Sequence, residues 1–284
     1  MGYLEDITKK AYSAIKENPY IALPATLIWI PSALLGIVLF LGTKNIIETN
    51  TLISIIESLK SDPTMLFYSL WAIAKDYLIY SLAILFAIII LHYYIKATYS
   101  VIAKAIHQNK PVSIFEALLE SKKRIVALMI TDALLILIAF MAVIAVLVIE
   151  IPICIFLGPI GIILLLFVDF FLFFAGLVYL VLLSIISISV VVLDKKSGLD
   201  AIKESYRLIK YEKLDSWLLI ILVFIISSIY IFLVSAVVEI FSLLIGPYAV
   251  LVGTILHVFL PVFGYICYTL LYFHLKEKIK EPAH

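Results

Sequence analysis

Charged residues are scarce in this chain: aspartate, glutamate, lysine and arginine make up 14% of its 284 residues, whereas hydrophobic residues make up 64%. A water-soluble domain of this composition would expose large apolar patches and aggregate. The net charge of +1 also leaves no basic surface of the kind that binds nucleic acid. These shortages exclude a soluble protein and a nucleic-acid partner, and they indicate an all-α membrane protein.

Cysteine is also rare in this chain, and the short signatures of common enzymes are absent. Both cysteines, Cys154 and Cys267, lie in apolar stretches, so we expect no disulfide. The sequence contains no glycine-rich phosphate loop, no Gly-x-Ser-x-Gly motif and no His-Glu-x-x-His or Cys-x-x-Cys spacing for a metal. We therefore predict a protein that is not an enzyme and that carries no metal or cofactor.

Long apolar runs are what the sequence does contain. A helix needs roughly 20 apolar residues to cross the hydrocarbon core of a membrane. The sequence predicts six transmembrane helices, over residues 20–43, 77–105, 125–148, 162–193, 214–245 and 248–273. The long outer connection, residues 44–76, is predicted to hold an amphipathic helix. The broken stretch 151–161, with Pro152 and a Gly-Pro-Ile-Gly turn, is predicted to connect the third and fourth helices outside the membrane.

The basic residues are distributed unevenly between these helices. Of the 21 lysines and arginines, 18 fall in the segments before the first helix, between the second and third, between the fourth and fifth, and after the sixth. Loops rich in lysine and arginine stay on the cytoplasmic side. The sequence therefore predicts a multi-pass protein of the cell membrane with both termini in the cytoplasm.

An internal repeat refines this architecture. Residues 113–121 align without gaps on residues 197–205, and a fainter copy near the N-terminus matches Tyr12, Ile15 and Lys16 to Tyr206, Ile209 and Lys210. Each copy precedes a membrane hairpin. We therefore expect one membrane domain of three parallel repeats, residues 1–106, 107–193 and 194–284, each an amphipathic elbow helix followed by two spanning helices.

The elbow helices are basic as well as amphipathic, which suits a helix lying flat at the membrane interface. The side chains that we expect to contact lipid headgroups are Lys122, Lys123, Arg124, Lys203, Arg207 and Lys210. A simpler interpretation is that the elbows only turn the chain and dock on the helical bundle.

Ionisable residues inside the predicted helices form two groups of candidates, because charge within the hydrocarbon is costly. Near the outer side lie Asp169, Glu239 and His257, with Glu150 at the start of the adjoining outer turn, and together they would line a polar cavity able to bind a cation or relay a proton. Near the inner side lie His92, Lys96 and Asp132. The alternative interpretation is that each carboxylate only forms local hydrogen bonds near the interface.

Residues 190–210 read Val-Val-Val-Leu-Asp-Lys-Lys-Ser-Gly-Leu-Asp-Ala-Ile-Lys-Glu-Ser-Tyr-Arg-Leu-Ile-Lys. This pattern resembles the signature of a broad group of polytopic membrane proteins of unknown function. The group includes archaeal proteins, YciC-like bacterial proteins and the membrane domain fused to some glycerophosphoryl diester phosphodiesterases. The resemblance implies an all-helical, six-span domain without established catalytic residues.

The leading functional hypothesis is a non-enzymatic membrane protein that binds membrane lipids, a membrane-protein partner or a second copy of itself, and supports envelope maintenance or the assembly of a complex. The alternative is a small transporter or channel built around the outer polar cavity. Lysine outnumbers arginine 19 to 2 and glutamine occurs once, a bias that predicts a thermophilic archaeal source.

Overall fold

The computed structural model describes residues 2–28, 31–32, 34–35, 38, 63–211, 213–245, 256 and 259–280, and every element of regular structure in these ranges is a helix. In chain order the elements are α1 (Gly2–Glu17), the 3-10 helix η1 (Pro19–Ala22), α2 (Leu23–Thr26), α5 (Pro63–His107), α6 (Ile114–Lys122), α7 (Ile125–Leu193), α8 (Gly198–Tyr211), α9 (Lys213–Ile245) and α11 (Phe259–Lys280). The predicted all-α fold is confirmed for this part of the chain.

Four described segments are long and apolar enough to cross a membrane: Leu78–His107, Ile125–Glu150, Ala175–Leu193 and Trp217–Leu243. Their most apolar windows have mean hydropathies between 2.3 and 3.0. Segments of this length and composition are stable in lipid, where the helix satisfies its own backbone hydrogen bonds. The chain is therefore a multi-pass helical membrane protein. The two other predicted spans, residues 20–43 and 248–273, lie partly outside the described residues.

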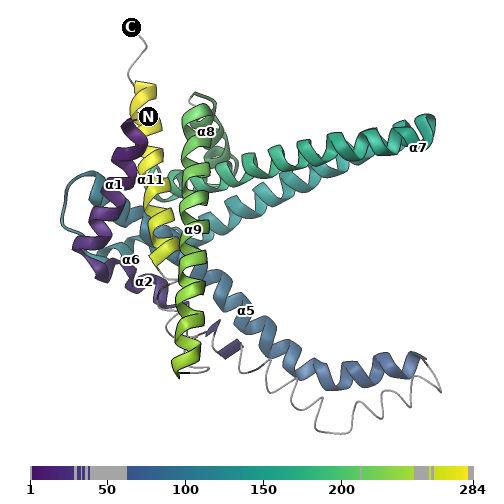
Figure 1. The fold of residues 1–284 in the computed structure, drawn as a ribbon, viewed down its shortest axis with the longest axis horizontal. Helices are drawn as coiled ribbons and strands as arrows, with labels where there is room; N and C mark the ends of the chain where they lie inside the picture. Colours follow the sequence, from purple (N-terminus) through teal and green to yellow (C-terminus); the bar gives the residue numbers. More distant parts are fainter. Residues whose placement is uncertain are drawn as a thin grey trace. The chain divides into compact units, whose positions relative to one another are not determined.

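Helix α7 is a hairpin of two long arms (Figure 1). Its one non-helical residue, Gly158, has φ 60° and ψ −148°, a conformation that glycine adopts without steric penalty. Asp132 and Ser184 lie equally far from Gly158 in sequence, and the Ser184 hydroxyl donates to the Asp132 carboxylate over 3.4 Å. The chain therefore turns back within the predicted connection 151–161, at its Gly-Pro-Ile-Gly turn, but the connection is shorter than predicted. Both arms stay helical up to Gly158, because Pro159 fits the first turn of the second arm.

Two other boundaries differ from the predicted ones. Helix α5 begins at Pro63, so residues 63–76 of the predicted outer connection are helical, and proline is favoured at the first position of a helix. The amphipathic helix predicted in that connection falls on residues 44–62, which lie outside the described residues. Helix α11 continues past residue 273 to Lys280, because its charged last turn projects beyond the apolar part of the helix.

Contacts divide the chain into two units, residues 25–93 and residues 1–24 together with 94–284. Helix α5 contributes to both. In the smaller unit, Ile79, Tyr80 and Phe86 of α5 are exposed, as lipid-facing side chains of a membrane helix are. The larger unit contains the buried residues that the following paragraphs describe.

Three short helices of the larger unit, α1, α6 and α8, each bury a pair of residues four apart. The pairs are Ile7 and Ala11, Ala117 and Ser121, and Ala201 and Ser205, none of them more than 6% exposed. Residues four apart share one face of a helix. In the alignment of the three sequence copies the pairs occupy the same two positions. The three predicted elbows therefore exist as helices and present equivalent faces to their neighbours.

Each of these short helices docks on one longer helix. The Thr98 and Ser121 hydroxyls hydrogen-bond over 2.9 Å where α6 meets α5. Where α8 meets the second arm of α7, the Tyr206 ring packs edge-on against Tyr179. Helix α1 lies alongside α11, the last described helix (Figure 1). Helices α6 and α8 therefore dock on the helices that directly precede them, whereas α1 docks on α11.

Helix α1 runs antiparallel to α11. Its first turn contacts the end of α11, where Tyr3 stacks on His274 and lies beneath the Lys278 amino group. Its later residues lie beside the beginning of α11, near Phe263. Helix α1 therefore lies along α11 rather than flat across the bundle, because its apolar stripe packs against α11.

Helix α5, the second arm of α7 and helix α11 run parallel to one another. Ser189 of α7 and Ser100 of α5 both hydrogen-bond to Thr269 of α11, over 3.2 and 3.5 Å. Seven to eight residues further on, α5 and α11 meet again where the His107 imidazole lies 3.2 Å from the Glu277 carboxylate. The second arm of α7 likewise meets α11 again beyond Ser189, at Asp194 and Lys276. Advances in the same direction along both partners require a parallel arrangement.

Candidate functional site

Two of the inner candidates, Lys96 and Asp132, form an ion pair between α5 and the first arm of α7. The Lys96 Nζ lies 4.0 Å from the Asp132 Oδ2, and the two side chains are only 16% and 11% exposed. The Ser184 hydroxyl donates to the other carboxylate oxygen from the second arm. Three apolar spans thus converge on one shielded charge pair. Such a pair holds helices together in lipid, because separating the charges would leave each without its counter-ion.

The third inner candidate, His92, is half-buried and packs edge-on against Tyr93, with ring centroids 6.5 Å apart. It belongs to the smaller unit, whereas Lys96 and Asp132 belong to the larger one.

The outer candidates cannot be assembled from the described residues. His257 and the side chain of Asp169 lie outside them. Glu239 is exposed, and its backbone carbonyl accepts a hydrogen bond from the Ser242 hydroxyl over 2.6 Å. Glu150 is half-buried at the end of the span Ile125–Glu150. The outer polar cavity stays a prediction.

The basic elbow candidates are at the surface. Lys122 and Lys123 of α6 are exposed and Arg124 is half-buried, whereas Lys203, Arg207 and Lys210 of α8 are all exposed. Arg207 forms an ion pair with Glu204, with an N–O distance of 2.6 Å. Part of the positive charge of α8 is thus compensated within the helix itself.

Glu204 is held between two cations. Its carboxylate accepts from Arg207 on one side and from Lys196 on the other, the latter over 3.0 Å. Partial burial works to raise the pKa of this carboxyl group, but the hydrogen bonds and charges of the two cations outweigh it. The pKa of Glu204 is therefore lowered from its ordinary value, and the group is ionised near neutral pH.

A second ion pair was not predicted from the sequence. Lys276 of α11 donates to the Asp194 carboxylate at the end of α7 and to the Tyr272 hydroxyl, the latter over 2.8 Å. Asp194 ends a long apolar run, and Lys276 is the first cation after the apolar part of α11. The contact could have been predicted, because Asp194 and Lys276 are an acidic residue and a cation at equivalent helix ends.

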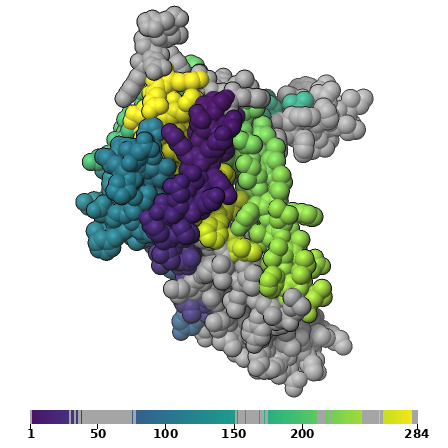
Figure 2. Space-filling view, turned by 60° about the vertical axis from the view of Figure 1, so that its left-hand side comes forward, coloured from purple at the N-terminus to yellow at the C-terminus, as the bar shows by residue number. Residues whose placement is uncertain are grey.

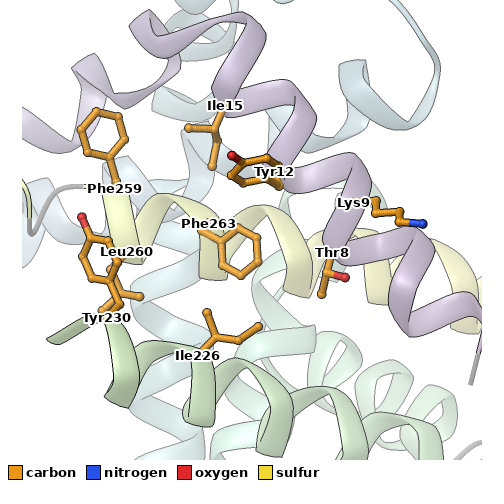
Figure 3. Close-up of a pocket in the computed structure, with 9 residues that line it drawn as sticks. All are labelled: Thr8, Lys9, Tyr12, Ile15, Ile226, Tyr230, Phe259, Leu260 and Phe263. Atoms are coloured by element: carbon orange, nitrogen blue, oxygen red, sulfur yellow. The ribbon is translucent and has the colours of Figure 1, made fainter. Parts of the chain in front are cut away.

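A pocket of about 570 Å³ lies where α1, α9 and α11 meet (Figure 3). Helix α1 contributes Thr8, Lys9, Tyr12 and Ile15. The other walls are Ile226 and Tyr230 of α9 and Phe259, Leu260 and Phe263 of α11. In the space-filling view α11 is visible at the bottom of the gap between α1 and α9 (Figure 2). The volume is typical of sites for small ligands, which hold about 300–1,000 Å³.

The pocket has two unlike ends. Thr8 and Lys9 lie at one end, with the Lys9 amino group pointing away from the aromatic rings, and Phe259 and Tyr230 lie at the other (Figure 3). The Tyr230 hydroxyl donates to the Leu256 carbonyl, so its polar atom is satisfied within the protein. The interior is therefore lined by apolar and aromatic surface, and cationic charge is confined to the mouth.

None of the pocket residues was a candidate from the sequence alone. The available signal was the stripe of Tyr12 and Ile15 on α1, which marks an apolar face but not what covers it. Within the described residues, no group of three or more histidine, cysteine, aspartate or glutamate side chains is arranged to hold a metal ion. Comparison of the chain with protein-family models, with curated proteins and with solved structures gives no match.

Proposed function

We propose that the protein is a six-span membrane domain built from three parallel repeats, residues 1–106, 107–193 and 194–284. The two spans that complete this count are residues 20–43 and 248–273. The proposal is supported by the equivalent buried pairs of α1, α6 and α8 and by the parallel course of α5, the second arm of α7 and α11. It also extends the resemblance of residues 190–210 to polytopic membrane proteins.

The repeats would be arranged in a ring. Helices α6 and α8 dock on the helices that directly precede them, and α1 docks on α11, which ends the third hairpin. Helices α5, α7 and α11 each contribute one hydroxyl to the interior, and the Thr269 hydroxyl hydrogen-bonds to those of Ser100 and Ser189. A threefold axis along the membrane normal accounts for both observations.

The orientation that we propose places both termini and all three elbows on the cytoplasmic face of the cell membrane. The support is that 18 of 21 basic residues lie in the segments on that side. Reporter tags at the two termini should both be protected from externally added protease in intact cells. Cleavage of either tag before lysis would contradict this orientation.

The function that we propose is the binding of membrane lipid without catalysis, in support of envelope maintenance or the assembly of a membrane complex. The observation that carries it is the apolar pocket between α1, α9 and α11. An apolar cavity of this size beside membrane-spanning helices excludes water and is readily filled by a hydrocarbon chain. The basic elbow residues would add attraction to anionic headgroups.

Native mass spectrometry of the purified full chain tests this function. The Ile226→Trp variant fills the pocket from α9, so its retained lipid should fall well below that of the unmodified protein. Ile225→Trp is the matched control, because Ile225 is exposed on the same helix and does not line the pocket. Equal retention by the two variants would remove the pocket from the lipid-binding function.

A further inference from the structure

The contacts of α8 with α7 and of α1 with α11 correspond in the sequence alignment, and we call each of them a joint. The two joints differ in whether an aromatic contact fills them. At the joint of α8 with α7, the Tyr206 ring packs against Tyr179 with centroids 6.4 Å apart. Tyr12 occupies the position of Tyr206 in the sequence alignment, and the two are 62% and 49% exposed, but Tyr12 lines the pocket beside Phe263. The contact of Tyr206 with Tyr179 fills the joint of α8 with α7. The joint of α1 with α11 is left open, and its opening is the pocket.

The mouth of this open joint carries the ion pair of Lys9 and Glu5. The Lys9 amino group donates to the Glu5 carboxylate over 2.6 Å. That hydrogen bond, together with the charge of Glu5, raises the pKa of Lys9, so the amino group stays protonated near neutral pH. An ammonium group has three N–H donors, and Glu5 accepts one of them. Two donors are left to interact with another anion at the mouth.

We propose that the open joint binds one hydrocarbon chain of a phosphate-bearing membrane lipid, with the chain between Ile226 and Phe263 and the phosphate beside Lys9. This inference rests on the proposed function and adds the class of lipid. Phosphate oxygens accept charge-assisted hydrogen bonds from an ammonium group, whereas the apolar interior offers the chain only dispersion contacts and exclusion of water.

The dimensions of the pocket favour a single chain over a whole lipid. A volume of about 570 Å³ lies in the middle of the range for small-ligand sites. The headgroup would stay outside, at the end where Lys9 is 72% exposed. The stem of Lys9 lines the wall while its charge reaches the aqueous side, which is the usual arrangement of lysine at a membrane interface.

Competition between lipids with the same chains tests the class of ligand. The purified full chain is incubated with equal amounts of dioleoyl phosphatidate, dioleoyl phosphatidylglycerol and uncharged dioleoylglycerol, and bound species are counted by native mass spectrometry. We expect the two phosphate-bearing lipids to be retained about tenfold over dioleoylglycerol, the ratio that corresponds to one charge-assisted contact.

Lys9→Met keeps the apolar stem and removes the charge, so it should reduce this preference to about twofold or less. Lys10→Met is the matched control, because Lys10 is exposed on the same helix and does not line the pocket. An unchanged preference in Lys9→Met, or equal loss in both variants, would overturn the assignment of the phosphate to Lys9.

The outcomes separate this inference from the proposed function. Retention of all three lipids in equal amounts, abolished by Ile226→Trp, would overturn the phosphate class and leave lipid binding intact. Displacement of the lipids by inorganic phosphate alone would also overturn it, because the site would then recognise a soluble anion. Loss of retention in Ile226→Trp together with the Lys9-dependent preference supports both.

Discussion

The Tyr3 ring stacks on the His274 imidazole with ring centroids 4.3 Å apart and planes 5° from parallel. This contact joins α1 to α11 across nearly the whole sequence. It lies beside a second contact, in which the Lys278 amino group is placed 5.9 Å from the centre of the same tyrosine ring. The first turn of α1 is thus fixed to the end of α11 by aromatic and cation–π interactions.

Replacing Tyr3 by alanine should release this end of α1. Aromatic pairs contribute about 0.5–1.5 kcal/mol beyond their buried area, and the cation–π contact is lost with them. We expect faster cleavage of α1 by limited proteolysis in detergent and a lower thermal midpoint. Tyr20→Ala is the control, because the Tyr20 side chain is exposed and its hydroxyl bonds only to nearby Asn18. Equal cleavage of both variants would contradict the anchoring role.

Breaking the Lys96–Asp132 pair from one side should destabilise the protein more than removing both charges. Lys96→Met or Asp132→Leu alone removes one charge of a shielded pair and leaves the other, which costs on the order of 3 kcal/mol. The double variant should recover most of that loss. The measurement is the free energy of unfolding in a double-mutant cycle, with Lys110→Met as the exposed control. A double variant as unstable as the sum of the single ones would show that the charges do not interact.

The turn of the α7 hairpin should tolerate no side chain. Gly158→Ala places a Cβ at φ 60°, and the resulting strain should lower the unfolding free energy by about 1–3 kcal/mol. Gly176→Ala is the matched control, since Gly176 lies in the helical part of the same hairpin with open space around its Cα. We expect that change to be neutral or slightly stabilising. A loss at position 176 equal to that at 158 would rule out backbone strain as the cause.

Glu204 should make the protein less stable in acid. Its folded-state pKa is lowered below the unfolded value, so its ionised form favours the folded state. That contribution is present above the unfolded pKa and is lost as the pH falls through the folded-state pKa. Glu204→Gln should therefore lower the thermal midpoint near neutral pH and flatten its decline in acid.

Glu120→Gln is the matched control for this pH dependence. Glu120 occupies the position of Glu204 in the aligned copy, but its side chain is exposed. An acid-dependent decline that persists unchanged in Glu204→Gln would assign the effect to other carboxyl groups.

The local elements of the fold were predictable because the hydrophobic pattern is strong. Residues 214–245 were predicted as one helix, and α9 begins at Lys213 and ends at Ile245. The short elbows were also predictable, since Ser113 is a residue type favoured before a helix and its hydroxyl accepts from the Glu116 N–H. The turn at Gly158 was predicted from its Gly-Pro-Ile-Gly sequence, but the connection is shorter than predicted, because a helix accepts proline in its first turn.

The candidate site was predictable only in part. Lys96 and Asp132 were each recognised as costly charges within apolar helices, but their pairing depends on how α5 packs against α7, which no local pattern encodes. The pocket was missed for the same reason. Its walls come from helices far apart in sequence, and its aromatic residues look like ordinary core or lipid-facing positions until α1 is placed against α11.

The closure of α1 on α11 also sets an order of events during synthesis. The ribosome makes α1 first, yet the helix that covers Leu4, Ile7 and Ala11 is the last one described. Until α11 has been translated and inserted, that stripe has only the bilayer surface to rest on. The packing of α1 is therefore a late step. A nascent chain halted before α11 would expose the apolar stripe of α1 to the translocation machinery and its chaperones.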